Sequence, residues 1–450
     1  MHQTRPRSSG SPSGRSRTPR CRIRSPRRPL AIVTLATLAL AALTSGSTTL
    51  IQRTPPGGPA ATTGRLSVRA DHGGSAVSLG PCRIGGALGV QMSEGLPTAP
   101  GYAHSTGSVH ALTLMIDFPD AHGSEPAMKR YGEFFPQTSN WYRTSSYGRL
   151  DYRPEAPVKR WLRMPSPFSS YGIQRGSPYQ PGYRRLAQDI VKAADQQVDF
   201  RKYDIINVLA TPNAGPSALD TVLSVTFSGN DEAPVADGVK LSNMSFIYSR
   251  QDDGSGSYRH TGYRVLPHEN GHTFGLPDLY TSSGGGSVGH WDIMSEDWGA
   301  NNDMLGWHKW KLGWLDDSQV SCAPTPGTHE AALSPLETRG GTKLAVIPMS
   351  ESAAYVVEVR TRAGNDDAVC RPGVLVYRVD GDVDTGQGPV SVRDSTPDSG
   401  GCTLRANVQA ELSDAPYTVG QTFTDAAHGI IINITGKDKS GDYRVRITRS

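Results

Sequence analysis

The sequence predicts a mixed α/β (α+β) fold followed by a C-terminal β-rich module that resembles a β-sandwich. Two observations support this prediction. Within residues 106–320, runs of aliphatic and β-branched residues alternate with segments of helical spacing. From residue 321 to residue 450, short alternating apolar segments are separated by Gly, Pro and Asp. A chain of 450 residues is long enough for both parts.

The first part is expected to begin with a buried strand at 111–120, where the sequence is ALTLMIDFPD. Apolar residues recur at helical spacing through 181–200, and Pro181 stands near the start of that segment. YDIINVLATPN and the segment 241–249 predict further strands, and 264–274 predicts a second helix. Strands and helices therefore mix throughout this part.

The C-terminal module is expected to consist of strands at four segments that alternate in polarity. They are 353–362, 373–382, 429–435 and 442–449. Modules of this kind more often pack against a catalytic domain or bind substrate than perform chemistry.

An export signal is predicted at residues 1–47. Residues 1–28 hold nine arginines and no acidic residue, and the uncharged apolar run Leu30–Leu43 precedes small polar residues, an order typical of signal peptides. A bilayer-spanning helix needs about 20 apolar residues, so a stable membrane anchor is not expected. The pair Arg27-Arg28 leaves both the general and the twin-arginine route open. We therefore expect a secreted, extracellular protein.

The positive net charge of +4 depends on this N-terminal segment. Its nine arginines leave 37 of the 46 basic residues to face 42 acidic residues in the rest of the chain. The charge therefore gives no reason to expect a nucleic-acid partner, because binding to phosphates needs a basic surface.

Residues 48–105 are predicted to be a linker or propeptide, because they are rich in Gly, Ser, Thr, Pro and Ala without a sustained apolar period. Outside the signal lie four cysteines: Cys82, Cys322, Cys370 and Cys402. An even number in an exported chain predicts two disulfides, and three pairings are possible. The alternative for Cys82 is a thiolate that caps a metal in a latent form.

Candidate catalytic residues lie in LPHENGHTFGLPDLY, residues 266–280. His268 and His272 stand four apart, so on a helix they differ by about 40° in azimuth and project from one face. Two imidazoles placed in this way can share one metal ion. Glu269, beside the first histidine, can take a proton from a water that the metal activates.

Three further positions extend this motif. Gly275 can adopt a positive φ, which lets the chain leave the helix and turn back beneath the metal. Asp278 completes the pattern H-E-x-x-H-x-x-G-x-x-D with a carboxylate suited to Zn²⁺, leaving a fourth position for water. Met294, in GHWDIMSEDWG, follows sixteen residues later. This spacing resembles that of the metzincin metalloproteases, whose Met-turn forms a hydrophobic floor under the metal.

Across residues 106–320 the chain resembles the immune inhibitor A-like, or M6, family of secreted bacterial metalloproteases. The segments that carry the resemblance are LTLMIDFPD, SSYGRLDYRPE, HENGHTFGLPDLY, GHWDIMSEDWG and LGWHKWKLGWL, with weaker similarity in YVVEVR and GVLVYRVD. The resemblance implies a metzincin-like zinc protease domain in which His268, His272 and Asp278 bind zinc and Glu269 is the catalytic acid/base. The acidic third ligand departs from the wider metzincin pattern, where many members have His.

Other polar residues near this motif leave alternatives open. Glu296 stands two residues after Met294, where some metzincins have Tyr, and in a thermolysin-like scheme it would be the third zinc ligand. Tyr280 and His290 are candidates to stabilise an oxyanion or to support a ligand. Calcium is a second candidate cofactor, because acidic clusters occur at 230–232 and 301–303, although neither fits an EF-hand loop.

These features together predict a secreted zinc endopeptidase that acts as a monomer on protein or peptide substrates. The alternative is an exported zinc-containing binding or adhesion protein with an inactive protease-like domain. Glu269 weighs against that alternative, since a structural zinc site needs the two histidines but not this carboxylate.

Overall fold

The computed structural model describes most of the chain from residue 80 onward. The described ranges are 80, 82–87, 89–214, 224–251, 262–281, 286–297, 303–402 and 410–450. The predicted signal peptide, residues 1–47, and the first part of the predicted linker, residues 48–79, lie outside the described residues.

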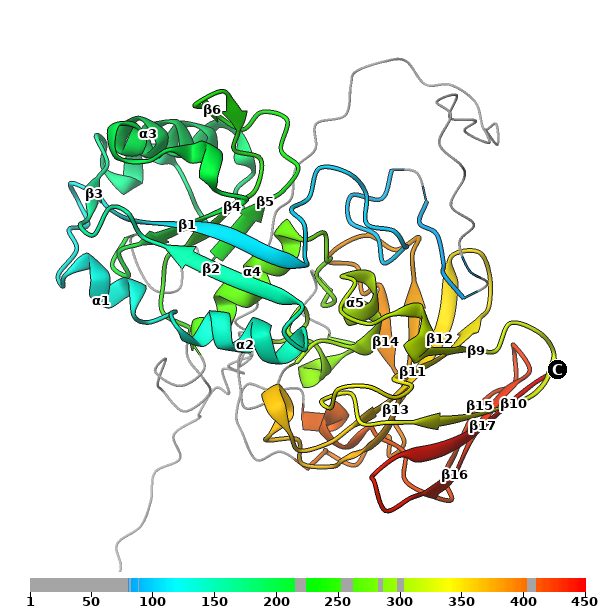
Figure 1. Ribbon diagram of the computed structural model, residues 1–450. Coiled ribbons are helices and arrows are strands. Elements are labelled where there is room, and N and C mark those ends of the chain that lie inside the picture. Colours follow the sequence, from blue (N-terminus) through cyan, green and yellow to red (C-terminus); the bar gives the residue numbers. More distant parts are fainter. Residues whose placement is uncertain are drawn as a thin grey trace, which may run out of the picture. The chain divides into compact units, whose positions relative to one another are not determined.

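A six-stranded, mostly parallel sheet forms the centre of the first part (Figure 1). Its strands lie in the order β2, β1, β4, β8, β5, with β3 beside β1. Their bounds are β1 Gly107–Asp117, β2 Leu150–Glu155, β3 Leu162–Arg163, β4 Ile205–Ala210, β5 Ser224–Phe227 and β8 Met244–Ile247. Strand β5 runs antiparallel to β8 at one edge, and the other pairings are parallel. The predicted mixed α/β class is confirmed.

Helices cover both faces of this sheet. Along β1, Ala111 and Met115 belong to a core shared with α4 (Val265–Thr273), whereas Leu112 and Leu114 belong to a core shared with α3 (Arg184–Ala194). Successive residues of a strand point to opposite faces, so a strand covered on both sides is a continuous apolar run. The remaining helices and the small hairpin are α1 Ala127–Tyr131, α2 Gln137–Ser145, α5 Gly306–Lys311, β6 Val235–Ala236 and β7 Val239–Lys240.

Two facing sheets form the C-terminal part. The five-stranded sheet has the order β14 Val390–Val392, β13 Gly373–Asp380, β12 Ala353–Arg360, β11 Leu344–Pro348 and β9 Val320–Cys322. The four-stranded sheet has the order β10 Gly327–Leu333, β17 Tyr443–Arg449, β16 Ile430–Lys437 and β15 Thr422–Asp425. Alternate residues of β16, such as Ile432 and Ile434, share a core with Val357 and Val376 of the other sheet. This is the packing of a β-sandwich.

The five-stranded sheet is buried on both faces, because its second face packs against the α/β part. Every residue of β12 is buried. Val356 and Tyr377 share a core with Leu305 and Trp307, which lie at the start of α5. The α/β part and the sandwich are therefore joined by a common hydrophobic core rather than by a linker.

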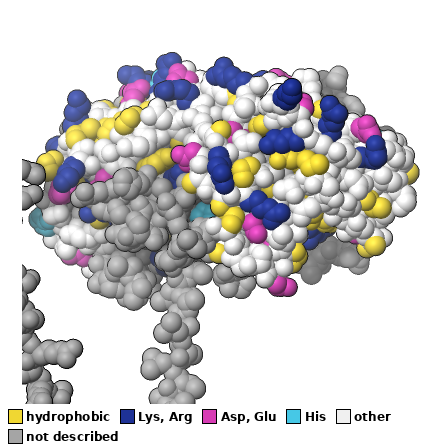
Figure 2. Space-filling view, turned by 90° about the horizontal axis from the view of Figure 1, so that it is seen from below, with side chains coloured by type: hydrophobic (Ala, Val, Ile, Leu, Met, Phe, Trp, Pro, Cys, Tyr) yellow, Lys and Arg dark blue, Asp and Glu magenta, His cyan; other side chains and the backbone are white. Residues whose placement is uncertain are grey.

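The face of the molecule shown in Figure 2 carries charged side chains that are scattered rather than clustered. On the face shown in Figure 2, Lys and Arg side chains are spread among acidic, apolar and uncharged residues. The large exposed hydrophobic residues of the described chain are Val235 on β6, Val419 in the turn before β15, and Ile431 on β16. None of the described helices combines the length and the apolarity needed to cross a bilayer.

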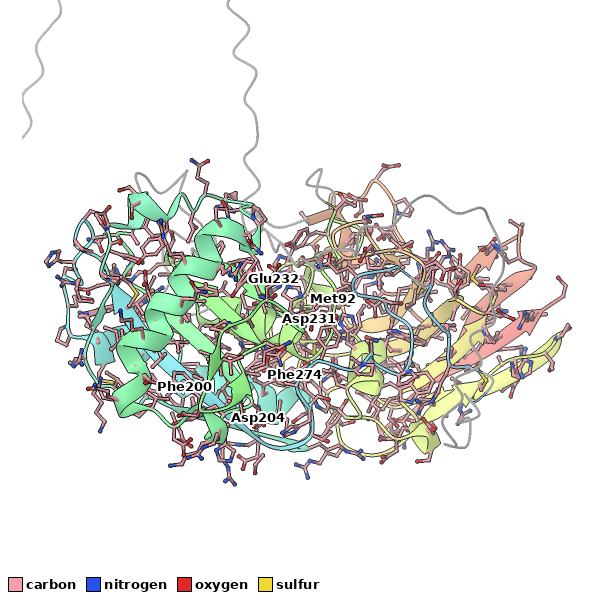
Figure 3. The ribbon with its side chains drawn as sticks, turned by 90° about the horizontal axis from the view of Figure 1, so that it is seen from above. Met92, Phe200, Asp204, Asp231, Glu232 and Phe274 are labelled. Carbon is pink, nitrogen blue, oxygen red and sulfur yellow. A yellow bond between two sulfur atoms is a disulfide. The ribbon has the colours of Figure 1, made fainter. Side chains whose placement is uncertain are left out.

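The described residues of the segment 82–106, which are 82–87 and 89–106 and are called here the strap, pack into the fold. Ile84 and Leu96 are buried in the core that the strap shares with α4 and α5. Met92 of the strap and Phe274, which directly follows α4, are labelled in Figure 3. The prediction of a linker or propeptide missed this packing. The strap makes its contacts with few apolar residues, a disulfide and polar groups, so it has no periodic apolar signature.

Two disulfides join Cys82 to Cys322 and Cys370 to Cys402. The prediction of two disulfides is confirmed, and the structure selects one of the three possible pairings. Cys82 links the strap to β9, the first strand of the sandwich part. The alternative of a Cys82 thiolate on a metal does not hold in this structure, because its sulfur is bonded to Cys322.

A buried ion-pair network ties the strap to the sheet interface. His308 of α5 lies between two carboxylates, with Nε2 2.9 Å from Oε1 of Glu94 and Nδ1 2.7 Å from Oδ2 of Asp292. All three side chains are fully buried. Burial alone would lower the pKa of His308. The charges of Asp292 and Glu94 together have the larger effect and raise the pKa to about 10. The strap therefore supplies one of two charges that keep a buried imidazolium stable.

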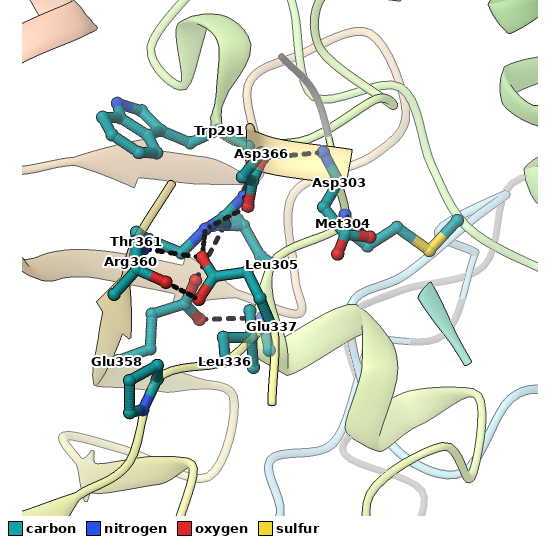
Figure 4. Close-up of polar contacts among 12 residues, drawn as sticks. Trp291, Asp303, Met304, Leu305, Leu336, Glu337, Glu358, Arg360, Thr361 and Asp366 are labelled. Atoms are coloured by element: carbon teal, nitrogen blue, oxygen red, sulfur yellow. Dashed lines mark hydrogen bonds and ion pairs between the residues drawn. The ribbon is translucent and has the colours of Figure 1, made fainter. Parts of the chain in front are cut away.

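A second buried network lies where β12 meets the segment before α5 (Figure 4). The guanidinium of Arg360 donates to Asp366 Oδ2, to Glu358 Oε1 and to the carbonyl oxygen of Trp291. Asp366 in turn accepts the backbone N–H of Asp303. These bonds join the sandwich to the loop that carries Trp291, so the two parts are fixed by charge as well as by apolar packing.

The Glu94–His308 pair predicts a pH-dependent stability. We expect Glu94→Gln to lower the free energy of unfolding by about 1–3 kcal/mol near pH 7, because a buried cation loses one charged partner. The folded pKa of His308 exceeds its unfolded value of about 6.5, so the stabilisation is complete below that pH and is lost as the pH rises toward 10. The difference between wild type and variant should therefore shrink between pH 7 and pH 10.

Urea unfolding of the disulfide-intact protein at several pH values measures this difference. Glu330→Gln is the matched control, because Glu330 is exposed in an ion pair with Arg446 and should change stability little. A difference between wild type and Glu94→Gln that grows with pH would contradict the assigned charge of His308.

Candidate metal centre

Helix α4 ends in a turn that brings the chain back beside its own histidines. The backbone N–H of Leu276 bonds to the carbonyl of Gly271 at 3.1 Å, and the N–H of Gly275 bonds to that of His272 at 3.0 Å. This pair of bonds is a Schellman motif, which requires a left-handed residue after the helix. Gly275 fills that position with a φ of 89°, and a Cβ there would lie 2.4 Å from the side chain of Thr98.

The two predicted histidines present their Nε2 atoms to the same space. Nδ1 of His268 lies 2.8 Å from the carbonyl oxygen of Ile293, and Nδ1 of His272 lies 2.8 Å from that of Leu276. A carbonyl can only accept, so each Nδ1 carries the hydrogen and each Nε2 is left as the metal-facing nitrogen. Both imidazoles are buried.

Asp278 completes a group of three possible metal ligands. Its Oδ1 lies 3.3 Å from Nε2 of His268 and 3.4 Å from Nε2 of His272. A tetrahedral site with metal–ligand distances of about 2.0–2.1 Å has ligand–ligand separations of about 3.3–3.4 Å. The three ligand atoms all lie within 4.8 Å of one another. Among the described residues, these three form the one group of His, Cys, Asp or Glu side chains that could hold a metal ion. Both separations between the carboxylate and an imidazole therefore fit a tetrahedral metal with two imidazoles and one carboxylate.

The charges around this group favour a cation. Burial alone would lower the pKa of His268. Interactions with Asp278, Asp297 and Glu269 together have the larger effect and raise the pKa to about 10. Burial raises the pKa of Asp278, yet the two imidazoles hold it well below its usual range. Without a metal, a proton on His268 therefore occupies the position between imidazole and carboxylate. A metal ion can replace that proton.

Glu269 is buried next to the two histidines, with one oxygen held and the other available. Its Oε2 accepts a hydrogen bond from Oγ1 of Thr226 on the edge strand β5, at 2.5 Å. Its Oε1 is buried and accepts no hydrogen bond of good geometry from a described residue, although the Ser224 hydroxyl is close enough to lower the pKa of this carboxyl. Burial raises the pKa of Glu269, although the two imidazoles act in the opposite direction. A carboxylate with a raised pKa and an unbonded oxygen is suited to accept and return a proton.

Met294 packs against helix α4, which carries the two histidines. A Cβ on Gly271 would meet the sulfur of Met294 at 2.5 Å, so the thioether packs against the backbone of α4 between the two histidines. The backbone of Met294 is held by Asp292, whose Oδ1 accepts its N–H at 2.7 Å, and its carbonyl accepts the N–H of Leu279 at 3.0 Å. The residue thus supports both the helix and the segment that carries Asp278.

The remaining predicted residues surround the three ligands without joining them. The ring of Tyr280 lies nearly parallel to that of His268, with centroids 6.4 Å apart. Nε2 of His290 lies 2.6 Å from Oε2 of Glu296. Glu296 therefore faces His290 and is not part of the ligand group, so the geometry favours Asp278 over Glu296 as the third ligand.

The acidic clusters considered for calcium have protein partners. Asp231 and Glu232 lie in the loop between β5 and β6 (Figure 3). Asp231 pairs with Lys240, and Glu232 accepts a hydrogen bond from Gln180. In the second cluster, Asn301 and Asn302 lie outside the described residues, and Asp303 accepts hydrogen bonds from Lys309, Ser145 and the backbone of Met304. The described residues of these clusters form no group of three metal ligands.

Sequence reasoning did not identify two residues that lie near the three candidate ligands. Asp297 is buried, its carboxylate accepts a hydrogen bond from Gln251 at 2.6 Å, and its charge helps to raise the pKa of His268. Thr226 holds Glu269 through its hydroxyl. An acidic residue just after Met294 and a polar residue inside a buried strand were the available signals.

No protein-family model matches the sequence, and no curated protein is significantly similar to it. The resemblance to the M6 metalloproteases therefore rests on the motifs quoted above.

The geometry predicts which carboxylate binds metal. We expect Asp278→Ala to raise the dissociation constant for Zn²⁺ by more than about 100-fold, because one of three ligands is lost. Glu296→Ala should leave that constant almost unchanged. Competition of the metal-free proteins with a chromophoric chelator gives both values, and the opposite ranking would establish the thermolysin-like scheme.

Proposed function

We propose that the protein is a secreted zinc endopeptidase of the metzincin type, similar to the M6 family of bacterial metalloproteases. The observation that supports this most directly is the arrangement of His268, His272 and Asp278. Oδ1 of Asp278 lies at a tetrahedral separation from the Nε2 atom of each histidine, and Oε1 of Glu269 accepts no well-formed hydrogen bond from a described residue. A site that only held a metal for stability would not require that carboxylate.

Zinc fits this donor set better than the harder cations. Two imidazole nitrogens and one carboxylate oxygen are typical of catalytic zinc sites, which keep one position open. Magnesium and calcium instead favour six or more oxygen ligands. When bound, zinc lowers the pKa of its water to about 7 and polarises a carbonyl oxygen.

The protein's own groups then carry the proton. Oε1 of Glu269 accepts the proton of the attacking water, while the hydroxyl of Thr226 keeps Oε2 and the side chain in place. Oε1 returns the proton to the peptide nitrogen as the C–N bond breaks. Glu269 thus begins and ends the cycle as a carboxylate, and the peptide bond is hydrolysed to an acid and an amine.

The rest of the chain supports export. The predicted signal peptide at 1–47 directs export, and two disulfides are compatible with an oxidising compartment. The substrates would be proteins or peptides cleaved by a monomer. The sandwich packs against the α/β part, which accords with a supporting or substrate-binding role.

The central test of this function is Glu269→Ala. We expect the variant to bind zinc with nearly normal affinity and to lose casein hydrolysis by several orders of magnitude, because the base is removed and the ligands remain. Zymography and chelator competition measure the two properties on the same preparation.

Glu330→Ala is the control for this test, since it removes an exposed carboxylate from β10 far along the chain from the site. Near-normal hydrolysis by Glu269→Ala, with contaminating protease excluded, would reject the assigned base. Zinc binding by the wild type without any peptidase activity would instead favour the exported binding protein.

A further expected outcome concerns maturation. The mature chain should begin before Cys82, because removal of the strap would break the Cys82–Cys322 bond and leave His308 without Glu94. N-terminal sequencing of the active secreted form, together with mass mapping of unreduced peptides, gives the answer. An active enzyme that begins beyond Tyr102 would show that the strap is a removable propeptide.

A further inference from the structure

The loop between β13 and β14, residues 381–389, contacts the third metal ligand directly. The hydroxyl oxygen of Thr385 accepts the backbone N–H of Asp278 at 2.9 Å and lies 3.4 Å from Oδ2 of the same residue, to which it donates. The N–H of Gly386 donates to the carbonyl of Asp278 at 3.2 Å. Thr281 and Gln387 form an antiparallel bridge just beyond these contacts.

These bonds fix both the backbone and the carboxylate of Asp278. One hydroxyl contacts the main-chain nitrogen and Oδ2, so rotation of the side chain about its first torsion is restricted. With Oδ2 held in this way, Oδ1 is the oxygen that faces the two imidazoles. Partners that orient a ligand in this way strengthen metal binding without touching the metal.

The strap holds this loop in turn. Oδ1 of Asp384 accepts three backbone N–H groups: those of Gln91 and Met92 at 3.0 Å and that of Thr385 at 2.8 Å. The hydroxyl of Ser93 donates to the carbonyl of Gly381 at 2.5 Å. The loop is thus anchored at both its start and its centre, and Thr385 is not a freely moving side chain.

We infer that Thr385 is a positioning residue for the metal ligand Asp278, and that the sandwich part therefore completes the metal centre. This inference rests on the proposed function in one respect, namely that the three ligands bind zinc. A domain that merely accompanied the protease would make no contact with a ligand, whereas this loop bonds to the ligand's backbone N–H, carbonyl and carboxylate.

The test compares Thr385→Val with Thr385→Ser in the full-length protein. Val keeps the shape but removes the hydroxyl, so the dissociation constant for Zn²⁺ should rise about 10- to 100-fold. Ser restores the hydroxyl and should return the constant to within about threefold of wild type. Thr385→Val puts a methyl group where the hydroxyl was, whereas Thr385→Ala puts nothing there. Thr385→Ala therefore gives a second measurement of the zinc affinity that is lost with the hydroxyl.

Thr422→Val is the matched control, because the Thr422 hydroxyl bonds to Asn433 on the exposed side of the other sheet. The absorption spectrum of bound Co²⁺ provides a signature that a purely structural role would not move, and it should change in Thr385→Val and Thr385→Ala but not in Thr385→Ser or Thr422→Val. Unaltered zinc affinity and Co²⁺ spectrum in Thr385→Val would overturn the inference. A wild-type chain that binds no zinc would reject the proposed function and this inference with it.

Discussion

The close approach of one carboxylate oxygen to two imidazole nitrogens is the constraint on which the rest of the structure depends. Oδ1 of Asp278 lies 3.3 and 3.4 Å from the Nε2 atoms of His268 and His272 in a fully buried position. Such a group is stable only with a cation between its members, which is either a proton or a metal. The Nδ1–carbonyl bonds, the glycine turn after α4 and the support from Met294 all maintain this geometry.

Three distant segments of the chain meet to satisfy that constraint. Helix α4 supplies the histidines, the sandwich loop holds Asp278 through Thr385, and the strap holds the sandwich loop through Asp384. The strap also reaches the Met-turn segment through Glu94, His308 and Asp292. The support of one small site thus comes from the α/β part, the sandwich loop and the strap together.

Sequence reasoning recovered what depends on short spacings and lost what depends on tertiary contacts. The histidines, Glu269, Gly275 and Asp278 were found because a helix and a turn place residues at fixed separations. Strands β12, β13, β16 and β17 of the sandwich were predicted from their short apolar segments, whereas β9, β10, β11, β14 and β15 were not. Thr226, Asp297 and Thr385 could not be identified, since a single hydroxyl or carboxylate has no pattern until folding gives it a partner. The strap was missed for the same reason, and the disulfide pairing required three-dimensional proximity.

Anomalous diffraction from crystals grown with Zn²⁺ tests the central claim most directly. Data collected on both sides of the zinc absorption edge locate the metal independently of any assumption about its ligands. The account predicts one strong peak at about 2.0–2.2 Å from Nε2 of His268, Nε2 of His272 and Oδ1 of Asp278, with Oε1 of Glu269 near the open position. A peak bound by Glu296 in place of Asp278, or no zinc at the histidines, would contradict it.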